Sequence, residues 1–326
     1  MKNLDFDWKP LALVPLLLLL VFPFIGSGST WVTLTVAGLA MGMIIFIIAS
    51  GLTLVFGLMD VLNFGHGVFI ALGAFVALSV LGLMPEWTAS TELWRNLAAV
   101  LPAIGLAMAA AGLGGLLFER WIVRPVYGNH LKQILITVGG AIIGEELIKV
   151  FWGPEQRRLE LPMGMSGTLF LGDARMEKYR LIAVAVGVLV FCLLTWTLTR
   201  TKIGLLIRAG VQDREMVESL GYRIKTLFIG VFVAGSALAG LGGVMWGLYL
   251  QNFTPQIGSQ VNVLILIVII IGGLGSTSGA LIGAVLVGLM ANYTGYLAPK
   301  AALFSNIALM MAILLWRPQG LYALSK

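Results

Sequence analysis

Polar side chains set three residues apart interrupt a glycine-rich stretch of an otherwise apolar sequence, 57–67. Asp60, Asn63 and His66 would share one face of a helix at this spacing. Polar groups at membrane depth are costly unless they face a bundle interior or water. The nearby glycines would permit a broken helix whose backbone groups line a pathway. The alternative is that Asn63 and His66 bond each other or nearby carbonyls and only hold the break in place.

A second group, Glu145, Glu146 and Lys149, places charges inside another apolar run. Glu145 and Lys149 are four residues apart, so they can form an ion pair on a helix surface. At ~1.5 Å per residue they would lie past the middle of the span, counted from its inner end. Ionisable groups buried there are usually functional. The alternative is a solvated position near the outer mouth of the bundle.

A third candidate is the hydrophilic stretch 209–223. Asp213 is suited to cap the start of a short helix, and Gly221 is suited to cap its end. A helix of roughly two turns is not stable alone in water, so it must dock on another surface. That surface is either the cytoplasmic side of its own bundle or a groove of a soluble partner. The apolar face would consist of Met216, Val217 and Leu220.

The residue types that most enzymes use are scarce. Two histidines and one cysteine do not supply a usual zinc site. The glycine-rich run 272–279 lacks the lysine and the preceding strand of a phosphate loop, so close helix packing or a membrane break is the better interpretation. We therefore expect no cofactor, no metal and no catalytic residue, and the chain is not predicted to be an enzyme.

The composition identifies the medium around these groups. Of the 326 residues, 59% are hydrophobic and only 11% are charged, whereas soluble domains carry about 25% charged residues. So much apolar surface requires lipid as the solvent. The net charge of +6 arises from basic residues in short breaks between apolar runs. That distribution is a membrane orientation signal, and we expect no nucleic-acid partner.

The apolar runs predict an all-α fold, a polytopic transmembrane helical bundle of about ten helices, in a single domain covering 1–326. Several runs are shorter than the ~20 residues of a full span, which indicates broken or half-helices. The first run resembles a signal peptide, but no convincing cleavage site follows, so we interpret it as a membrane helix. The runs are 11–25, 33–59, 68–83, 97–118, 134–152, 179–199, 226–249, 261–274, 280–297 and 301–316.

Lysine and arginine in the connections predict the orientation. The stretches 119–132 and 200–225 are both basic and are separated by two helices, so both can lie in the cytoplasm. The segment between them, 153–178, mixes charge signs and is predicted to be periplasmic. Both termini, including 1–10, are then predicted to be cytoplasmic. The segments 84–96 and 250–260 are also expected outside.

Taken together, these landmarks resemble the membrane-spanning permeases of the branched-chain amino acid type of ABC importer, most closely the LivH-like subunit. Their order and spacing agree over roughly residues 35–322. Each piece alone is weak, but the set is specific. The residues that carry the resemblance are 51–57, 62–67, Arg124-Pro125, 204–208, 213–221, 272–276 and 317–321.

The resemblance implies an ATP-driven, binding-protein-dependent importer of branched-chain amino acids or related small polar solutes such as urea, amides and aromatic acids. This chain would form half of the translocation pore. Its implied partners are a second, LivM-like permease subunit, two cytoplasmic ATP-binding subunits and a periplasmic solute-binding protein, all assembled around a chain embedded in membrane lipid. ATP would bind to the partners, which agrees with the missing phosphate loop.

The resemblance also assigns roles to the candidate segments. The segment 213–220 looks like the coupling helix that sits in a cleft of the ATPase, and the break at 63–67 looks like part of the path. ATP-driven closure of the ATPases would move the coupling helices and open the pore outward. The expected path residues are Asp60, Asn63, Phe64, His66, Gly67, Glu145 and Glu146. The expected coupling residues are Arg208, Asp213, Arg214, Glu215, Met216, Glu218, Leu220 and Gly221.

The chain departs from this family in two respects. The extra span 11–25 is more like the LivM-type subunit, and the charges at Glu145, Glu146 and Lys149 stand where uncharged polar residues are expected. Both departures argue against restricting the cargo to leucine, isoleucine and valine. A rival hypothesis is a single-chain secondary transporter driven by an ion gradient, which requires paired intramembrane carboxylates. A channel is a third class, and the absence of a charged ring argues against it.

Overall fold

The computed structural model describes residues 9–322, and within that range the chain is an all-α protein of thirteen α-helices. Ten of these helices begin and end within a few residues of the predicted apolar runs. The prediction of an all-α polytopic bundle is therefore confirmed. The ten are α1 (Leu13–Ile25), α2 (Gly28–Met59), α3 (His66–Gly82), α5 (Leu93–Phe118), α6 (His130–Trp152), α7 (Lys178–Arg200), α10 (Ile224–Leu250), α11 (Ile257–Gly272), α12 (Thr277–Leu297) and α13 (Ala302–Trp316).

The remaining elements lie in the connections. Two short antiparallel sheets occur: β1 (Arg157–Arg158) pairs with β4 (Asn252–Phe253), and β2 (Thr168–Leu171) forms a hairpin with β3 (Ala174–Glu177). The hydropathy patterns of 153–178 and 250–260 do not predict these strands, because two to four residues are too few to show an alternation. The short helical pieces are α4 (Pro85–Thr88), α8 (Lys202–Gln212), α9 (Arg214–Ser219), a π-helical turn (Glu119–Val123) and 3₁₀ turns at Arg124–Val126 and Pro299–Ala301.

Five helical segments of the described chain are long and apolar enough to cross a membrane. They are α2, α5 with its continuation to Val126, α7, α10 and α12. The helices α1, α3, α11 and α13 are apolar but shorter than the ~20 residues of a full span, as predicted for half-helices. Helix α6 is long enough for a span but carries the charges of Glu145, Glu146 and Lys149.

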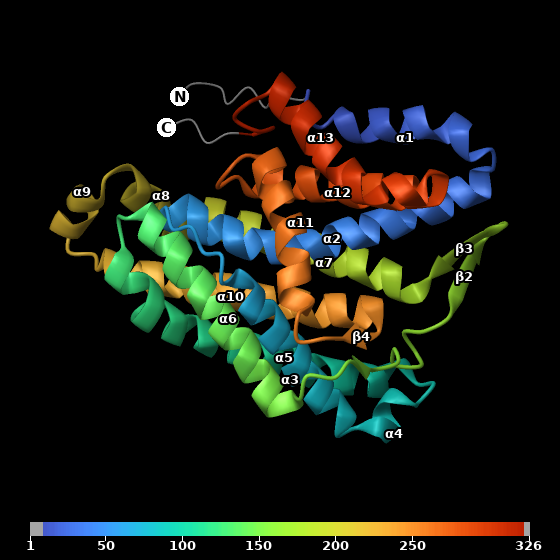
Figure 1. Ribbon diagram of the computed structural model, residues 1–326, viewed down its shortest axis with the longest axis horizontal. Coiled ribbons are helices and arrows are strands. Elements are labelled where there is room, and N and C mark those ends of the chain that lie inside the picture. Colours follow the sequence, from blue (N-terminus) through green and yellow to red (C-terminus); the bar gives the residue numbers. More distant parts are fainter. Residues whose placement is uncertain (1–8, 323–326) are drawn as a thin grey trace.

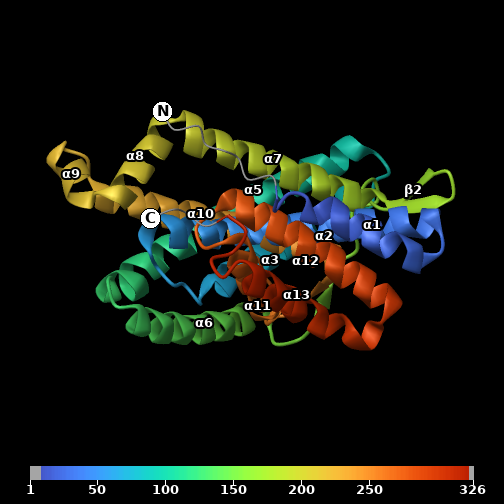
Figure 2. The same cartoon turned by 90° about the horizontal axis from the view of Figure 1, so that it is seen from above.

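Helices α2 and α10 run through the middle of the molecule, and α12 lies along α2 (Figure 1). Helices α6 and α7 lie on opposite sides of this centre (Figure 2). The α8–α9 segment stands at one end of the long axis and the β2–β3 hairpin stands at the other. The predicted cytoplasmic and periplasmic segments are thus at opposite ends. Which membrane face each end occupies stays a prediction.

Glycines allow the central helices to cross closely. A Cβ on Gly51 of α2 would collide with the carbonyl oxygen of Gly235 on α10. A Cβ on Gly258 of α11 would likewise collide with the carbonyl oxygen of Gly67 on α3. Close backbone approach at small residues is the usual way in which membrane helices associate. The first crossing holds α2 against α10, and the second holds α3 against α11.

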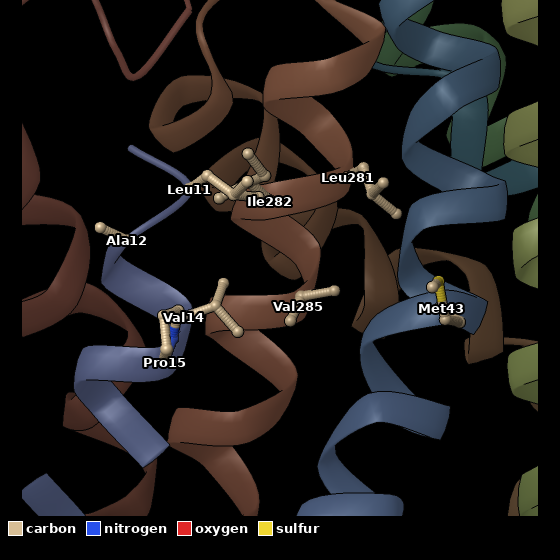
Figure 3. Close-up of a pocket in the computed structure, with 8 residues that line it drawn as sticks. All are labelled: Leu11, Ala12, Val14, Pro15, Met43, Leu281, Ile282 and Val285. Carbon is tan, nitrogen blue, oxygen red and sulfur yellow. The ribbon is translucent and has the colours of Figure 1, made fainter. Parts of the chain in front are cut away.

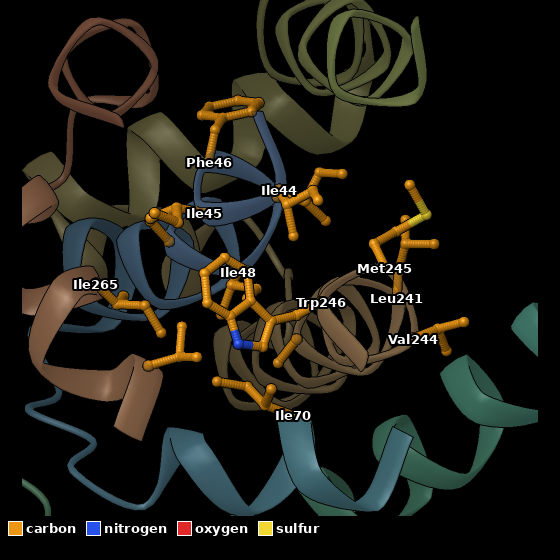
Figure 4. Packing of buried hydrophobic residues seen from close by; sticks show 14 of the residues in the cluster. Ile44, Ile45, Phe46, Ile48, Ile70, Leu241, Val244, Met245, Trp246 and Ile265 are labelled. Carbon is orange, nitrogen blue, oxygen red and sulfur yellow. The ribbon is translucent and has the colours of Figure 1, made fainter. Parts of the chain in front are cut away.

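The core between these helices is filled by large aliphatic and aromatic side chains. Trp246 of α10 lies between Ile48 of α2, Ile70 of α3 and Ile265 of α11 (Figure 4). Helix α2 is apolar around most of its circumference because neighbours cover most of it. The centre of the bundle is therefore packed.

Candidate functional site

Helix α2 stops at Met59, and the chain is not helical from Asp60 to Gly65. Asp60 adopts a left-handed conformation (φ 53°, ψ 38°), and its backbone N–H donates to the carbonyl of Phe56 at 2.9 Å. The expectation that Asp60, Asn63 and His66 share one helical face is therefore wrong. A left-handed residue ends a helix, so the spacing of three loses its meaning there.

Two side chains of α6 hold the backbone of the break. The N–H of Leu62 donates to Gln133 Oε1 at 3.2 Å, and the N–H of Phe64 donates to Thr137 Oγ1 at 3.2 Å. Gln133 and Thr137 are both buried. Non-helical backbone inside a membrane requires such partners, because lipid offers none. The sequence interpretation missed both residues, although their spacing of four on an apolar helix was an available signal.

Asn63 and His66 are buried in the break but do not bond each other. Asn63 Oδ1 accepts from the N–H of Gly65 at 3.0 Å, and His66 Nε2 lies 3.2 Å from the carbonyl oxygen of Ile48. Their other nitrogens, Asn63 Nδ2 and His66 Nδ1, have no hydrogen-bond partner within residues 9–322. The two side chains thus stabilise the break through backbone groups.

Asp60 lies apart from these two residues. Its carboxylate is exposed, and its Oδ2 lies 3.7 Å from His130 Nε2 at the start of α6. This exposed pair joins the end of α2 to α6. It places Asp60 at the edge of the break.

A small pocket of about 50 Å³ lies where the start of α3 meets α6 and α11. Phe64 and Gly67 line it from the break, and Glu145 lines it from α6. Two candidate segments far apart in the sequence therefore converge on one site. Asp60, Asn63, His66 and Glu146 do not line it. The lining residues are Phe64, Gly67, Val68, Ala71, Ala141, Glu145, Ile148, Pro255, Ser259 and Asn262.

Helix α11 adds two polar side chains that the sequence interpretation missed. Asn262 Nδ2 donates to the carbonyl oxygen of Phe64 at 3.3 Å, and Asn262 Oδ1 is buried without a partner in the described part of the chain. Ser259 Oγ donates to the carbonyl of Gln256 at 2.9 Å and lies 3.4 Å from Glu145 Oε2. Ser259 and Asn262 are three apart at the start of an apolar helix, and this spacing was the available signal.

Lys149 joins the two glutamates of α6. Its Nζ lies 3.3 Å from Glu145 Oε1 and 2.7 Å from Glu146 Oε1, so the predicted pair of Glu145 with Lys149 is confirmed. The side chains of Lys149 and Glu145 are 24% and 25% exposed, whereas that of Glu146 is 62% exposed. Glu145 therefore turns toward the pocket and Glu146 turns away from it.

A larger cavity of about 490 Å³ lies between α1, α2 and α12 (Figure 3). Leu11, Val14 and Pro15 face Met43 and the α12 residues Leu281, Ile282 and Val285 across it. Every lining side chain is apolar. A polar solute would lose its hydration there without gaining a hydrogen bond. The smaller pocket at the break is therefore the better candidate site.

The predicted caps of the 213–220 segment are confirmed. Asp213 Oδ1 accepts from the N–H of Met216 at 2.9 Å. Gly221 has φ +88°, and the N–H of Tyr222 reaches back to the carbonyl of Val217 at 3.3 Å. The helix between the caps, α9, has six residues and is shorter than predicted. It follows α8, which carries Arg208 on its exposed surface.

The three apolar residues of α9 and its C-terminal cap do not form one surface. Val217 is buried (3% exposed), whereas Met216 and Leu220 are 60% and 66% exposed. Val217 thus docks α9 on its own chain, and the other two side chains remain available to another surface. Glu218 is also exposed. The side chains of Arg214 and Glu215 lie outside the described residues.

Comparison with known proteins identifies relatives over most of the chain. A family model described as "Branched-chain amino acid transport system / permease component" matches residues 34–315. Helix α1 lies outside this matched range. No solved structure shows a significant match to the chain.

Individual relatives agree with the family model. The branched-chain amino acid transport permease protein BraD of Pseudomonas aeruginosa is 26% identical over 88% of this chain and 94% of its own. The permease protein LivH of Salmonella typhimurium is 26% identical over 87% of this chain and 92% of its own. The permease protein LivM of Escherichia coli is 27% identical over 98% of this chain and 76% of its own.

Proposed function

Since the chain belongs to the family of branched-chain amino acid transport system permease components, we propose that it is the non-catalytic membrane subunit of an ATP-driven, binding-protein-dependent ABC importer. The observation that supports coupling to an ATPase is the geometry of helix α9. This helix is too short to be stable alone, is capped at both ends and exposes Met216 and Leu220. Two exposed apolar side chains on a docked helix suit a groove of a cytoplasmic ATPase.

The packing of the chain supports a route from α9 to the pocket. Helix α9 contacts α10, and α10 packs against α2, α3 and α5 through the bundle. Gly73 of α3 approaches Gly240 of α10, so a shift of α10 displaces α3. The start of α3 carries the break and one wall of the pocket. Movement imposed on α9 by ATP-driven closure is therefore transmitted to the path by rigid helices.

The proposed path runs along the break and the pocket. Phe64, Gly67 and Glu145 contact the solute directly in this proposal. Asn63 and His66 maintain the non-helical break through their contacts with backbone groups. Asp60 and Glu146 lie at the margins of the path. The centre of the chain is packed with apolar side chains, so the path cannot run through it. In this proposal a second, LivM-like permease subunit forms the opposite wall of the path.

The cargo in this proposal is a branched-chain amino acid or a related small polar solute, such as urea, an amide or an aromatic acid. A periplasmic binding protein delivers the solute, and two ATP-binding subunits supply the energy. The chain resides in the bacterial inner membrane, and both termini are cytoplasmic. The relatives are named for branched-chain amino acids, and the charges on α6 argue for the broader class of cargo.

Copurification and uptake test the proposal. The chain is expressed with and without the candidate ATPase subunits, purified in detergent and reconstituted with the binding protein in vesicles. Leu220→Glu should weaken copurification of the ATPase about tenfold or more, because a charge replaces an apolar side chain that the ATPase groove would cover in the complex. The matched control is Leu169→Glu, which changes an exposed leucine on β2 at the opposite end.

Two results would contradict the proposal. One is copurification and ATP-dependent uptake that survive Leu220→Glu as well as they survive Leu169→Glu. The other is uptake by the chain alone, without ATP or other subunits, which is the behaviour of a secondary transporter.

A further inference from the structure

The charges of α6 lie at a depth where lipid cannot cover them. Glu145 precedes Trp152, the last residue of α6, by seven residues, which is roughly 10 Å of helix. Tryptophan is enriched at the membrane–water interface, so Glu145 is expected about 10 Å deeper in the membrane than Trp152. Glu145, Glu146 and Lys149 are all partly exposed on the isolated chain. Exposed charges at this depth require water or protein, so this side of α6 faces water or another protein chain and not lipid.

The polar side chains that line the pocket, Glu145, Ser259 and Asn262, offer more acceptor positions than free donors. An ionised Glu145 can only accept. Asn262 Nδ2 donates one of its two N–H groups to the carbonyl of Phe64, and Asn262 Oδ1 is a buried acceptor without a partner in the described residues. The single proton of Ser259 Oγ is directed to acceptors, either the Gln256 carbonyl or Glu145. A solute group that donates hydrogen bonds therefore fits this lining better than a group that accepts them.

The charge and size of the pocket narrow this donor further. Lys149 neutralises one of the two carboxylates that it contacts, so the group Glu145, Glu146 and Lys149 keeps one negative charge. A volume of about 50 Å³ holds one or two groups the size of a water molecule. The pocket therefore suits the head of a solute and does not enclose the whole molecule.

We propose that this pocket receives a positively charged nitrogen of the solute, such as an ammonium group, and that Glu145 is the residue that selects for it. The proposal rests on the proposed function, since it assigns the pocket to the solute path. It adds a selection step within the permease itself. Solutes whose leading group is an anion are disfavoured at this point.

The test measures charge selection without cargo, ATP or partner subunits. The single native cysteine, Cys192, lies on α7 on the opposite side of the molecule from α6 (Figure 2) and is replaced by serine. Ser259→Cys then places a thiol beside Glu145. The full-length chain in detergent is treated with aminoethyl methanethiosulfonate, which is cationic, and with sulfonatoethyl methanethiosulfonate, which is anionic. The readout is the ratio of the two modification rates.

Two further variants provide the matched comparison. Glu145→Gln and Glu146→Gln each remove one negative charge from the same group, and each leaves Lys149 with a carboxylate partner. Glu145→Gln should lower the cation-to-anion rate ratio about tenfold. Removing a unit charge a few ångströms away slows the cationic reagent and speeds the anionic one. Glu146→Gln should change the ratio by about twofold at most, because its side chain points away and is screened by water.

Three outcomes would overturn the proposal. They are an unchanged ratio in Glu145→Gln, an equal fall in both variants, and no reaction of the Ser259→Cys thiol with either charged reagent. If Ser259→Cys fails to give monodisperse protein, Gln260→Cys on the same exposed turn serves as the reporter and is held to the same criteria. Failure of the unmodified chain to copurify with any ATPase subunit would contradict the proposed function but leave this measurement intact.

Discussion

Replacing Thr137 by valine would remove the acceptor for one backbone N–H of the break while keeping the shape of the side chain. Thr137 Oγ1 accepts from the N–H of Phe64 at 3.2 Å and donates to the carbonyl of Gln133 at 2.7 Å. The second bond is dispensable, because the Gln133 carbonyl already serves the helix. The first is not, because Thr137 is fully buried and no water replaces it.

The cost follows from leaving that N–H unpaired. A buried donor without a partner destabilises a protein by about 1–3 kcal/mol. Thr137→Ser keeps the oxygen and loses one buried methyl group, which costs about 0.5–1.5 kcal/mol. We therefore expect Thr137→Val to lower the free energy of unfolding by about 1 kcal/mol more than Thr137→Ser does, and to lower uptake while ATPase copurification persists.

Reversible unfolding in mixed detergent micelles measures this difference in free energy. Both variants are compared with the unmodified chain under one detergent composition. Equal stabilities of Thr137→Val and Thr137→Ser would refute the role of Thr137 as the acceptor that holds the break. A valine variant that is more stable than the serine variant would refute it as well.

Three further predictions concern the crossings, the short helix and the break. Gly51→Leu should abolish the yield of monodisperse protein, because the new side chain would collide with the backbone of α10. Gly82→Ala should leave the gel-filtration profile unchanged, because the new methyl group would point into open space. Asp213→Ala should destabilise α9 by about 1 kcal/mol and weaken ATPase copurification several-fold, whereas Asp213→Asn retains the cap and should restore it. Equal copurification of the alanine and asparagine variants would contradict the role of the cap. His66→Leu should depress ATP-driven uptake without loss of ATPase copurification. Normal uptake in this variant would show that His66 contributes only to packing.

Local features of the chain could be predicted from the sequence. The ten apolar helices were predicted within a few residues, because the length and hydropathy of a run decide whether lipid can surround it. The caps at Asp213 and Gly221 and the pair of Glu145 with Lys149 were also predicted. Each depends on residues within about four positions of one another, which is the range over which helix geometry acts.

The breaks in regular structure were harder to predict. Asp60 ends α2 in a left-handed conformation, so a helical spacing could not place Asp60, Asn63 and His66 on one face. Val217 was expected beside Met216 and Leu220 on one surface, but the docking of α9 buries it alone. In both cases the outcome depends on what packs against the segment, and a periodicity does not contain that information.

The sequence alone determined that this chain is a bundle of membrane helices with a short capped helix between two of them. Only the tertiary structure brought Phe64, Glu145 and Asn262 to one pocket, and only it assigned Gln133 and Thr137 to the backbone of the break. The physical reason is the separation along the sequence over which each interaction acts. Solvation and helix capping are decided within a few residues, whereas a site between helices is decided by where glycines allow distant segments to cross.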